Sequence, residues 1–314
     1  MRTREQEVEP LINLSEITEV ELLILKRMRE FTIGEHSSMF HGTGFDFVGL
    51  RDWQAGDRFE NIDWPQSSLT NFSPLVVREF EQPTTSSAII VADRSASTRC
   101  GANSASGENR GLQIATLIAR AIATIGMSAV FFQDSIGLIT FDEGFHQLGA
   151  VRPRIGKGQV IHCLEAYQDG HGLQPIENVG SLSAALTGFS RKTALMPVIS
   201  DFLFDEAESF LRDLRQVNNV HDVFIMIVDA SFAFELPNVS AGWVEVYDVE
   251  TGRTRMMSRR ELSKQSARVR AYQDEIARQA KDNDLDVIRL SVDQVKFDIA
   301  LVEWVAERRL RRRK

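Results

Sequence analysis

Residues 88–92, Ala-Ile-Ile-Val-Ala, form an unbroken apolar run of strand-favouring side chains that ends at Asp93. Such a run is typical of a strand buried on both faces of a parallel sheet. Further strand-like segments alternate with helix-like segments of about 10 to 20 residues, which predicts crossover connections and an α/β fold with a largely parallel sheet. The other expected strands are residues 135–141, 194–200, 220–228, 243–247 and 286–290, and the expected helices are residues 110–125, 158–167, 181–189, 205–217, 259–281 and 293–309.

Oxygen-bearing side chains follow the first of these strands. Asp93, Ser95 and Ser97 stand at alternate positions where the chain leaves the expected sheet, and the carboxyl edge of such a sheet is where ligands bind. One carboxylate and two hydroxyls can converge on a small hard cation, which prefers oxygen ligands. Asp and Ser are also common in turns and caps, because they hydrogen-bond nearby backbone groups. The spacing alone leaves both interpretations open.

The N-terminal part of the chain has a different texture. Residues 14–31 carry apolar side chains near helical spacing, with Ser15 as the candidate N-cap. Residues 40–80 are rich in glycines, aromatic residues and short alternating segments, which predicts a small β-rich module. That stretch holds eight aromatic residues, with six acidic and three basic residues. A groove that tracks phosphates needs the opposite charge balance, so we expect the rings to form the module's own core and expect no nucleic-acid partner.

Composition points to an ordinary cytoplasmic protein. The net charge of −8 argues mildly against non-specific nucleic-acid binding. Cys100 and Cys163 lie far apart without metal-ligand spacing, which favours free thiols. No apolar run approaches the roughly 18 residues that a membrane span needs, and the first residues lack the hydrophobic region of a signal peptide. We therefore expect no membrane insertion.

Motifs ahead of the first buried strand carry a family resemblance. His41-Gly-Thr-Gly-Phe-Asp-Phe47, Leu50-Arg51-Asp-Trp-Gln-Ala-Gly56-Asp57 and Ile62-Asp63-Trp64 resemble the signature of the domain of unknown function 58 (DUF58) family. Glu250-Thr251-Gly252 and Arg270-Ala271-Tyr272 are similar to later elements of that family. The resemblance implies a helical segment at residues 1–34, a β-rich signature module at 35–85 and a Rossmann-like von Willebrand factor A-type domain at 86–314.

The same resemblance implies a metal-ion-dependent adhesion site. Its Asp-x-Ser-x-Ser element falls on Asp93, Ser95 and Ser97, and its late Ser-Asp element falls on Ser200 and Asp201. Gly180 stands at the position of the family's threonine, where only the neighbouring Ser181 or Ser183 supplies a hydroxyl, and Ser181 is the candidate fifth ligand of Mg²⁺ or Mn²⁺. The open position would take a carboxylate of a partner protein. The candidate partner-binding residues are Arg94 and Thr98 beside the site, and Arg51, Asp57, Asp63 and Trp64 in the module.

The function implied by the resemblance is that of a non-enzymatic adaptor, which acts with a MoxR-type AAA+ ATPase on a client protein in a chaperone-like or assembly system. One alternative is a Mg-dependent phosphohydrolase of the haloacid dehalogenase kind, with Asp93 as nucleophile and Lys192 beside the phosphate. In such enzymes the general acid is an aspartate two residues further on, where this chain has Ser95, and a serine does not protonate a leaving group at neutral pH. A further alternative is a structural platform whose metal site has decayed, as Gly180 would suggest.

Overall fold

The computed structural model describes residues 10–35, 46–54, 57, 59, 62–81, 87–102, 112–142, 148–176, 182–190, 192–234, 242–247, 253–290, 297, 299 and 301–304. The chain divides into two compact units. The first joins Met1–Arg27 to Ser86–Lys314, and the second is Met28–Thr85. The first unit contains all the residues predicted to bind metal.

A seven-stranded sheet forms the centre of the first unit. From one edge to the other its strands are β13 (Asp286–Leu290), β10 (Asp222–Val228), β9 (Leu195–Ser200), β3 (Ser87–Asp93), β6 (Ser135–Phe141), β7 (Gly149–Arg154) and β8 (Gln174–Pro175). Neighbouring strands from β13 to β6 run parallel, whereas β7 pairs antiparallel with β6 and β8 antiparallel with β7. The prediction of an α/β fold with a largely parallel sheet is confirmed.

The chain enters this sheet in the middle, at β3, and then builds outward in both directions. β6 and β7 lie on one side of β3, and β9, β10 and β13 lie on the other. This doubly wound order reverses between β3 and β9, and the crevice at such a reversal is where open α/β sheets bind ligands. Asp93 is the last residue of β3 and Ser200 the last of β9, so both end at this crevice.

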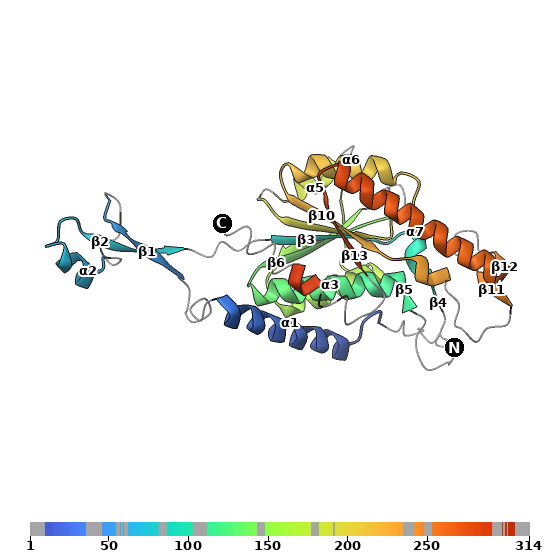
Figure 1. Cartoon of the computed structure of the whole chain (residues 1–314), viewed down its shortest axis with the longest axis horizontal. Helices are drawn as coiled ribbons and strands as arrows, with labels where there is room; N and C mark the ends of the chain where they lie inside the picture. The colour runs from blue at the N-terminus through green and yellow to red at the C-terminus, as the bar shows by residue number, and fades with distance from the viewer. Residues whose placement is uncertain are drawn as a thin grey trace. The chain divides into compact units, whose positions relative to one another are not determined.

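Helices cover both faces of the sheet. α3 (Ile114–Phe131) packs beside α4 (Lys157–Asp169), and α3 lies below the sheet in Figure 1. α5 (Leu182–Phe189), α6 (Ala207–Asn218) and α7 (Arg259–Asp282) lie above it. The unit is therefore a three-layer structure in which the central strands are buried on both faces, as the apolar run at residues 88–92 predicts.

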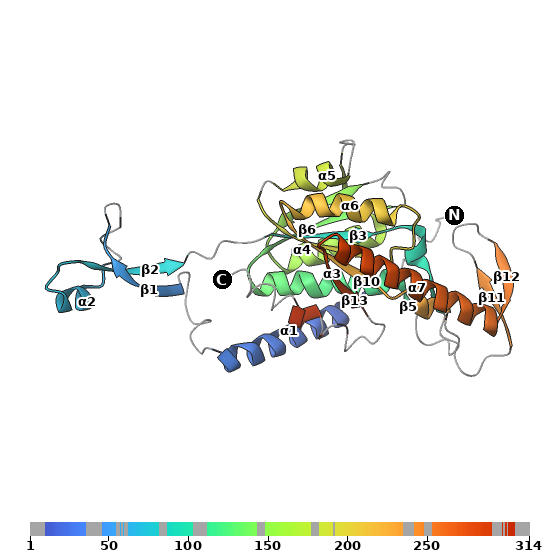
Figure 2. The ribbon, with the colours of Figure 1, turned by 45° about the horizontal axis from the view of Figure 1, so that its top comes forward.

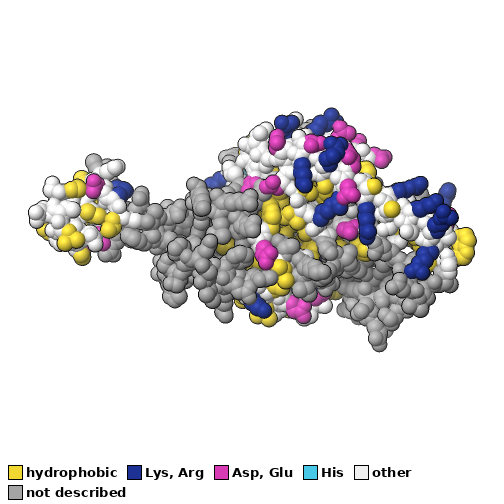
Figure 3. Space-filling view, viewed as in Figure 1, with side chains coloured by type: hydrophobic (Ala, Val, Ile, Leu, Met, Phe, Trp, Pro, Cys, Tyr) yellow, Lys and Arg dark blue, Asp and Glu magenta, His cyan; other side chains and the backbone are white. Residues whose placement is uncertain are grey.

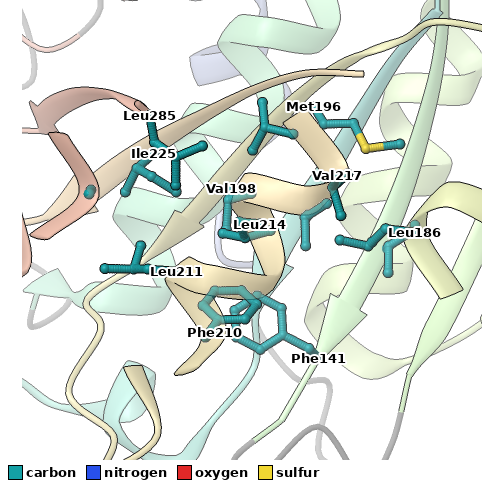
Figure 4. Close-up of a cluster of buried hydrophobic side chains, with 14 of the residues drawn as sticks. Phe141, Leu186, Met196, Val198, Phe210, Leu211, Leu214, Val217, Ile225 and Leu285 are labelled. Atoms are coloured by element: carbon teal, nitrogen blue, oxygen red, sulfur yellow. The ribbon is translucent and has the colours of Figure 1, made fainter. Parts of the chain in front are cut away.

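One hydrophobic core lies between the sheet and α6 (Figure 4). Alternate residues of each strand point into it, as Val198 and Ile225 do in β9 and β10. From the helix, Leu211 and Leu214 point back at the strands. These contacts hold β9 in place beside β3 and so fix the two strand ends that carry the acidic residues.

The segment α3 corrects two expectations. It begins four residues later and ends six residues later than the predicted 110–125. It also reaches 18 residues with a mean hydropathy of 1.8, so by length and composition it could span a membrane. Within the unit, however, 83% of it is buried. The core helix of a globular domain can reach the same length and hydropathy without spanning a membrane. Arg120 interrupts the apolar run and is itself buried.

The first helix, α1 (Leu14–Glu35), matches the predicted segment but not its predicted cap. The Asn13 side chain accepts a hydrogen bond from the backbone N–H of Glu16 (2.9 Å), and the Glu16 carboxylate accepts one from the N–H of Asn13 (2.8 Å). This reciprocal pair is a capping box, so Asn13 is the N-cap and the Ser15 prediction is wrong. Ile17, Val20 and Ile24 are buried, and the ion pair between Glu21 and Lys157 ties the helix to the start of α4.

One strand pair outside the central sheet precedes α7. β11 (Trp243–Tyr247) was predicted as a strand, and it pairs antiparallel with β12 (Thr254–Ser258), which the sequence pattern did not predict. The pair lies where α7 begins (Figures 1 and 2). Lys and Arg side chains gather at this end of the unit in Figure 3, and Arg253, Arg255, Arg259 and Arg260 there are exposed. The local surface is therefore basic in a chain of net charge −8.

The remaining short elements of the first unit flank the sheet. They are the 3-10 helices η2 (Ala96–Arg99) and η4 (Ser231–Phe234) and the strand pair β4 (Gly101–Ala102) and β5 (Leu112–Gln113). Of the predicted helix at 293–309, the described residues 297, 299 and 301–304 are helical. Trp304 in that segment packs against Phe224 of β10, with ring centroids 3.8 Å apart.

The second unit, Met28–Thr85, contains an antiparallel strand pair and a short helix. β1 (Asp46–Asp52) pairs with β2 (Val76–Glu81), with a register shift between Phe47 and Gly49. α2 (Trp64–Leu69) lies between them in sequence. Both strands fall within the stretch that the sequence texture assigns to a β-rich module.

Candidate metal centre

The loop after β3 is shaped by the side chain of Asp93. The backbone N–H of Ser95 donates to Asp93 Oδ1 (2.7 Å), and Thr98 Oγ1 donates to the carbonyl of Ser95 (2.7 Å). These bonds turn the chain into η2 directly beyond the strand, because Asp side chains readily bond to backbone two residues on. Ser95 Oγ and Ser97 Oγ end 2.9 Å apart. The alternate spacing of Asp93, Ser95 and Ser97 therefore does bring their oxygens together.

The end of β9 brings the second acidic residue to the same place. Ser200 Oγ donates to Asp93 Oδ2 (2.5 Å), and Ser97 Oγ donates to Asp201 Oδ1 (3.2 Å). Asp201 Oδ1 also accepts from the N–H of Leu203 (3.0 Å). Phe202 between them has a φ of +58°, which is unusual for a bulky residue and marks a sharp turn. Four of the five predicted metal ligands thus lie in one cluster at the switch point of the sheet.

Asp201 is the least satisfied group of this cluster. Asp93 and Asp201 are both 0% exposed, and Asp201 Oδ2 has no hydrogen-bond partner within the described part of the chain. Burial, with the charge of Asp93 as the second cause, raises the pKa of Asp201 from 3.8 to about 7. Two buried carboxylates side by side repel each other unless a proton or a cation lies between them. The cluster therefore has the donor set and the uncompensated charge of a cation site.

Two residues that sequence analysis did not single out hold the centre in place. The hydroxyl of Tyr167, near the end of α4, donates to the backbone carbonyl of Asp93 (2.9 Å). Gln273 of α7 donates from Nε2 to the carbonyls of Asp201 (2.9 Å) and Val228 (2.8 Å). The signal for Gln273 was its position: it is a buried polar residue on the apolar stripe that contains Val269, Ile276 and Ala280. For Tyr167 the sequence carried no comparable signal.

The other predicted site residues lie around or apart from this cluster. Arg94 and Thr98 adjoin it in the loop after β3. Ser181, the candidate fifth ligand, and Gly180 lie outside the described residues. No group of three or more His, Cys, Asp or Glu side chains suited to a metal occurs in the parts of the chain that are described. The centre therefore depends on two carboxylates and on serine hydroxyls.

The candidate partner-binding residues of the second unit make contacts within that unit. Arg51 donates from both Nη atoms to the Asp57 carboxylate (2.6 and 2.7 Å). This bond lowers the pKa of Asp57 to about 2. Asp63 is the N-cap of α2, where its side chain accepts from the N–H of Gln66 (3.2 Å). Trp64 is 56% exposed.

Lys192 lies away from the cluster. It precedes β9, whereas Asp201 follows the strand, and the six residues of the strand extend over about 20 Å at ~3.3 Å per residue. Lys192 is therefore at the amino edge of the sheet, opposite the acidic residues. This position does not suit the phosphate-balancing role that the phosphohydrolase alternative gave it.

The fold and the centre together define a class of protein: a doubly wound α/β domain with a buried pair of carboxylates at the switch point of its sheet. The family model described as "Protein of unknown function DUF58" matches residues 49–282. The chain therefore belongs to the DUF58 family, and the family resemblance of its sequence motifs is confirmed. No curated protein matches the chain.

Solved structures give remote likenesses. The conserved hypothetical protein BatB from Bacteroides thetaiotaomicron is 13% identical, with a TM-score of 0.37 and coverage of 71% of this chain and 98% of that one. An aerotolerance-related membrane protein from Bacteroides fragilis is 14% identical, with a TM-score of 0.36 and coverage of 71% and 99%. The pilus adhesin SpaC from Lactobacillus rhamnosus GG is 11% identical, with a TM-score of 0.38 and coverage of 72% and 31%.

Proposed function

We propose that this chain is a metal-dependent protein-binding protein built on a von Willebrand factor A-type domain. The observation that carries the proposal is the buried pair of carboxylates, Asp93 and Asp201, with Asp201 Oδ2 lacking a hydrogen-bond partner in the described part of the chain. Without a cation, either one of the two carboxylates keeps a proton or the two negative charges repel each other in a buried site. A divalent cation bound between them would remove the repulsion without a proton. The doubly wound strand order supports the domain type.

The proposed ligands are Asp93 and Asp201 with the hydroxyls of Ser95 and Ser97, and Ser181 is a further candidate. Hard cations such as Mg²⁺ and Mn²⁺ prefer oxygen donors of this kind and readily keep part of their water shell. When bound, the ion would offer an open coordination position to an acidic side chain of a partner. Tyr167 and Gln273 keep the two strand ends in register for this role, because each bonds the backbone of an acidic residue.

The proposed partner is a MoxR-type AAA+ ATPase, with a client protein bound through the same domain, in the cytoplasm. This part of the proposal is supported by the family resemblance of the sequence motifs. The proposed activity is binding and not catalysis, since Ser95 occupies the position at which a dehalogenase-type enzyme needs a general acid.

Calorimetric titration with Mn²⁺ and Mg²⁺ tests the metal site. We expect one binding event in the wild type, and none in Asp93→Ala or Asp201→Ala. Asp282→Asn changes an exposed carboxylate on α7 and is expected to bind metal like the wild type. A wild type that binds neither ion would overturn the metal site and leave the structural-platform alternative.

Reconstitution with the purified MoxR-type ATPase tests the partner. We expect binding in Mg²⁺ that is lost in a chelator and in Asp93→Ala. If the chain binds metal but does not bind the ATPase, the proposed partner is wrong and the proposed metal site is supported. A chelator-sensitive hydrolysis of p-nitrophenyl phosphate that disappears in Asp93→Asn would instead favour the phosphohydrolase.

A further inference from the structure

A pocket of about 770 Å³ opens beside the candidate metal centre. Its walls come from the loop after β3, the end of β6, the first residues of α3 and β7, and the end of α4. Sites for small molecules and side chains typically occupy about 300 to 1,000 Å³. The pocket is therefore large enough to hold a ligand of its own.

The pocket shares its wall with the metal centre but not the metal ligands. Thr98 and Tyr167 line it, and these two residues bond the carbonyls of Ser95 and Asp93. None of the four described metal ligands contributes to the lining. A ligand in the pocket would consequently lie next to the metal site without competing for the cation.

Two arginines give the pocket a cationic side. Arg94 and Arg99 line it, and Asp142 is the one acidic residue in the described part of the lining. Within the described residues, neither guanidinium makes an ion pair with an Asp or Glu side chain. The Arg94 guanidinium lies over Gly170, where an added Cβ would be 3.2 Å from Nη1. Because Gly170 ends α4 with a φ of +82°, a side chain there would be strained and would displace Arg94, so the glycine keeps this position open.

Apolar side chains also line the pocket. Leu148, Leu173 and Ile176 line it after β6 and around β8, and Leu11 adds a side chain from the segment before α1. That segment is anchored there, since the backbone N–H of Leu11 donates to Gln168 Oε1 (2.7 Å). A pocket lined by both arginines and apolar side chains suits a ligand with an anionic head and an apolar stem.

We infer that this pocket binds a carboxylate that carries an apolar stem. A guanidinium binds a carboxylate in a bidentate manner, and the two arginines outnumber the one acidic residue among the described residues of the lining, which favours an anion. Two sources share this chemistry: a free aliphatic carboxylic acid, and the C-terminal carboxylate of a partner chain that ends in apolar residues. The inference stands apart from the metal proposal, because neither arginine belongs to the metal ligand set.

Ligand-observed NMR titration of the full chain, in a chelator, tests the chemistry. The probes are octanoate and octanamide, and the peptide acetyl-Ala-Leu-Leu with a free C-terminus and with a C-terminal amide. We expect the carboxylate of a pair to bind about tenfold more tightly than its amide, as the loss of a charged hydrogen bond implies. If octanoate alone binds, the ligand is a free aliphatic carboxylic acid. If the peptide with a free C-terminus binds, the ligand is the C-terminal carboxylate of a partner chain. Equal binding of acid and amide, or tighter binding of inorganic phosphate than of any carboxylate, overturns the inference.

Variants locate the binding. Arg99→Gln removes an exposed guanidinium that packs in no core, and it is expected to weaken the carboxylate probes about tenfold. Arg94→Gln should do the same. Arg154→Gln, an exposed arginine at the far end of β7, is the matched control and should change binding less than twofold. If Arg154→Gln weakens the probes as much as Arg99→Gln does, the attraction is a general surface charge effect and the inference is wrong. Mn²⁺ binding measured on Arg99→Gln should equal that of the wild type.

Discussion

At the residue scale, Asp201 is where sequence position, burial and charge act on one side chain. It follows β9 directly, it is fully buried, and it lies beside Asp93. Its pKa is raised by burial and by Asp93 to about 7, above the ordinary 3.8. Because the pKa of Asp201 is raised in the folded state, its protonated form contributes to the free energy of unfolding. This contribution is complete below pH 3.8 and is lost as the pH rises through about 7. The metal-free protein should therefore be less stable at pH 8 than at pH 5.

The same pKa predicts how metal affinity depends on pH. A cation must displace the proton of Asp201, so affinity should rise with pH up to about 7 and level off above it. Below that value we expect about a tenfold change per pH unit for one displaced proton. Calorimetric titration with Mn²⁺ at pH 5.5, 6.5, 7.5 and 8.5 measures this dependence. An affinity that stays constant from pH 5.5 to 7.5 would contradict it.

Asp201→Asn is the control for that titration. The amide can keep an acceptor for Ser97 and Leu203 at Oδ1 while removing the buried charge. We expect its melting temperature without metal to exceed that of the wild type at pH 8 but not at pH 5.

At this scale the sequence predicted the residues of the loop after β3, but not the residues that hold this loop in place. Asp93, Ser95 and Ser97 converge through bonds that span two or three residues, which is why their spacing was informative. The bonds from Tyr167 and Gln273 reach over 74 and 72 residues. Pairings over such separations depend on how the helices cross the sheet, and a local pattern does not contain that.

At the element scale, α3 has a close approach that depends on one glycine. A Cβ added at Gly126 would lie 2.7 Å from Ile136 Cδ1 and 2.9 Å from Val160 Cγ1. Alanine in a helix interior normally gains about 0.5–1 kcal/mol over glycine. At Gly126 we expect overpacking, which costs about 1–3 kcal/mol, to cancel or exceed that gain. Urea denaturation should show Gly126→Ala to be no more stable than the wild type.

Gly158→Ala is the matched substitution for Gly126→Ala. Gly158 lies in α4, where an added Cβ meets nothing within 4 Å. Only the higher helix propensity of alanine should therefore act, and the free energy of unfolding should rise by up to about 1 kcal/mol. A gain at Gly126 equal to the gain at Gly158 would mean that α3 and β6 have room to separate.

The helix α6 supplies the aromatic core beside the centre. Phe210 is 1% exposed, and its ring centroid lies 5.3 Å from that of Phe141 and 6.1 Å from that of Phe202. We expect Phe210→Ala to lower the free energy of unfolding by about 3–5 kcal/mol through loss of transfer energy and an unfilled cavity. Arg212→Ala on the exposed face of the same helix should change it by less than about 0.5 kcal/mol. Chemical denaturation compares the two, and similar losses would contradict the packing of α6.

Strands with an unbroken pattern were predictable and strands with an interrupted pattern were not. β6 follows its predicted bounds because its apolar run is buried, and β13 also follows its predicted bounds although it is an edge strand. β7 was missed because Arg152-Pro153-Arg154 interrupts its pattern. β8 pairs only with Gly149 and Ala150, so Pro153 lies beyond that pairing, where a missing N–H is tolerated. β12, half of an exposed pair, likewise lacks the burial that creates a readable period.

At the scale of the whole molecule, one unit is interrupted by the other. Met1–Arg27 and Ser86–Lys314 form the first unit, and Met28–Thr85 forms the second. We expect that replacing residues 28–85 by a flexible linker of about 12 residues leaves the first unit folded. Its Mn²⁺ affinity should stay within about twofold of the wild type, because every proposed metal ligand belongs to the first unit. Thermal unfolding and calorimetry measure both, and loss of a cooperative transition would show that the units depend on each other.

The sequence by itself determined the class of fold and the loop chemistry: buried strands alternating with helices, and Asp93, Ser95 and Ser97 at the end of the first strand. Both are local, because a strand or a turn is encoded by neighbours a few residues apart. Only the tertiary structure decided that β9 lies beside β3, where Ser200 bonds to Asp93 across 107 residues of chain and brings Asp201 to the same crevice. Strand order arises from packing of helices on both faces of the sheet. The same packing leaves an arginine-lined pocket beside the centre, which no stretch of sequence encodes on its own.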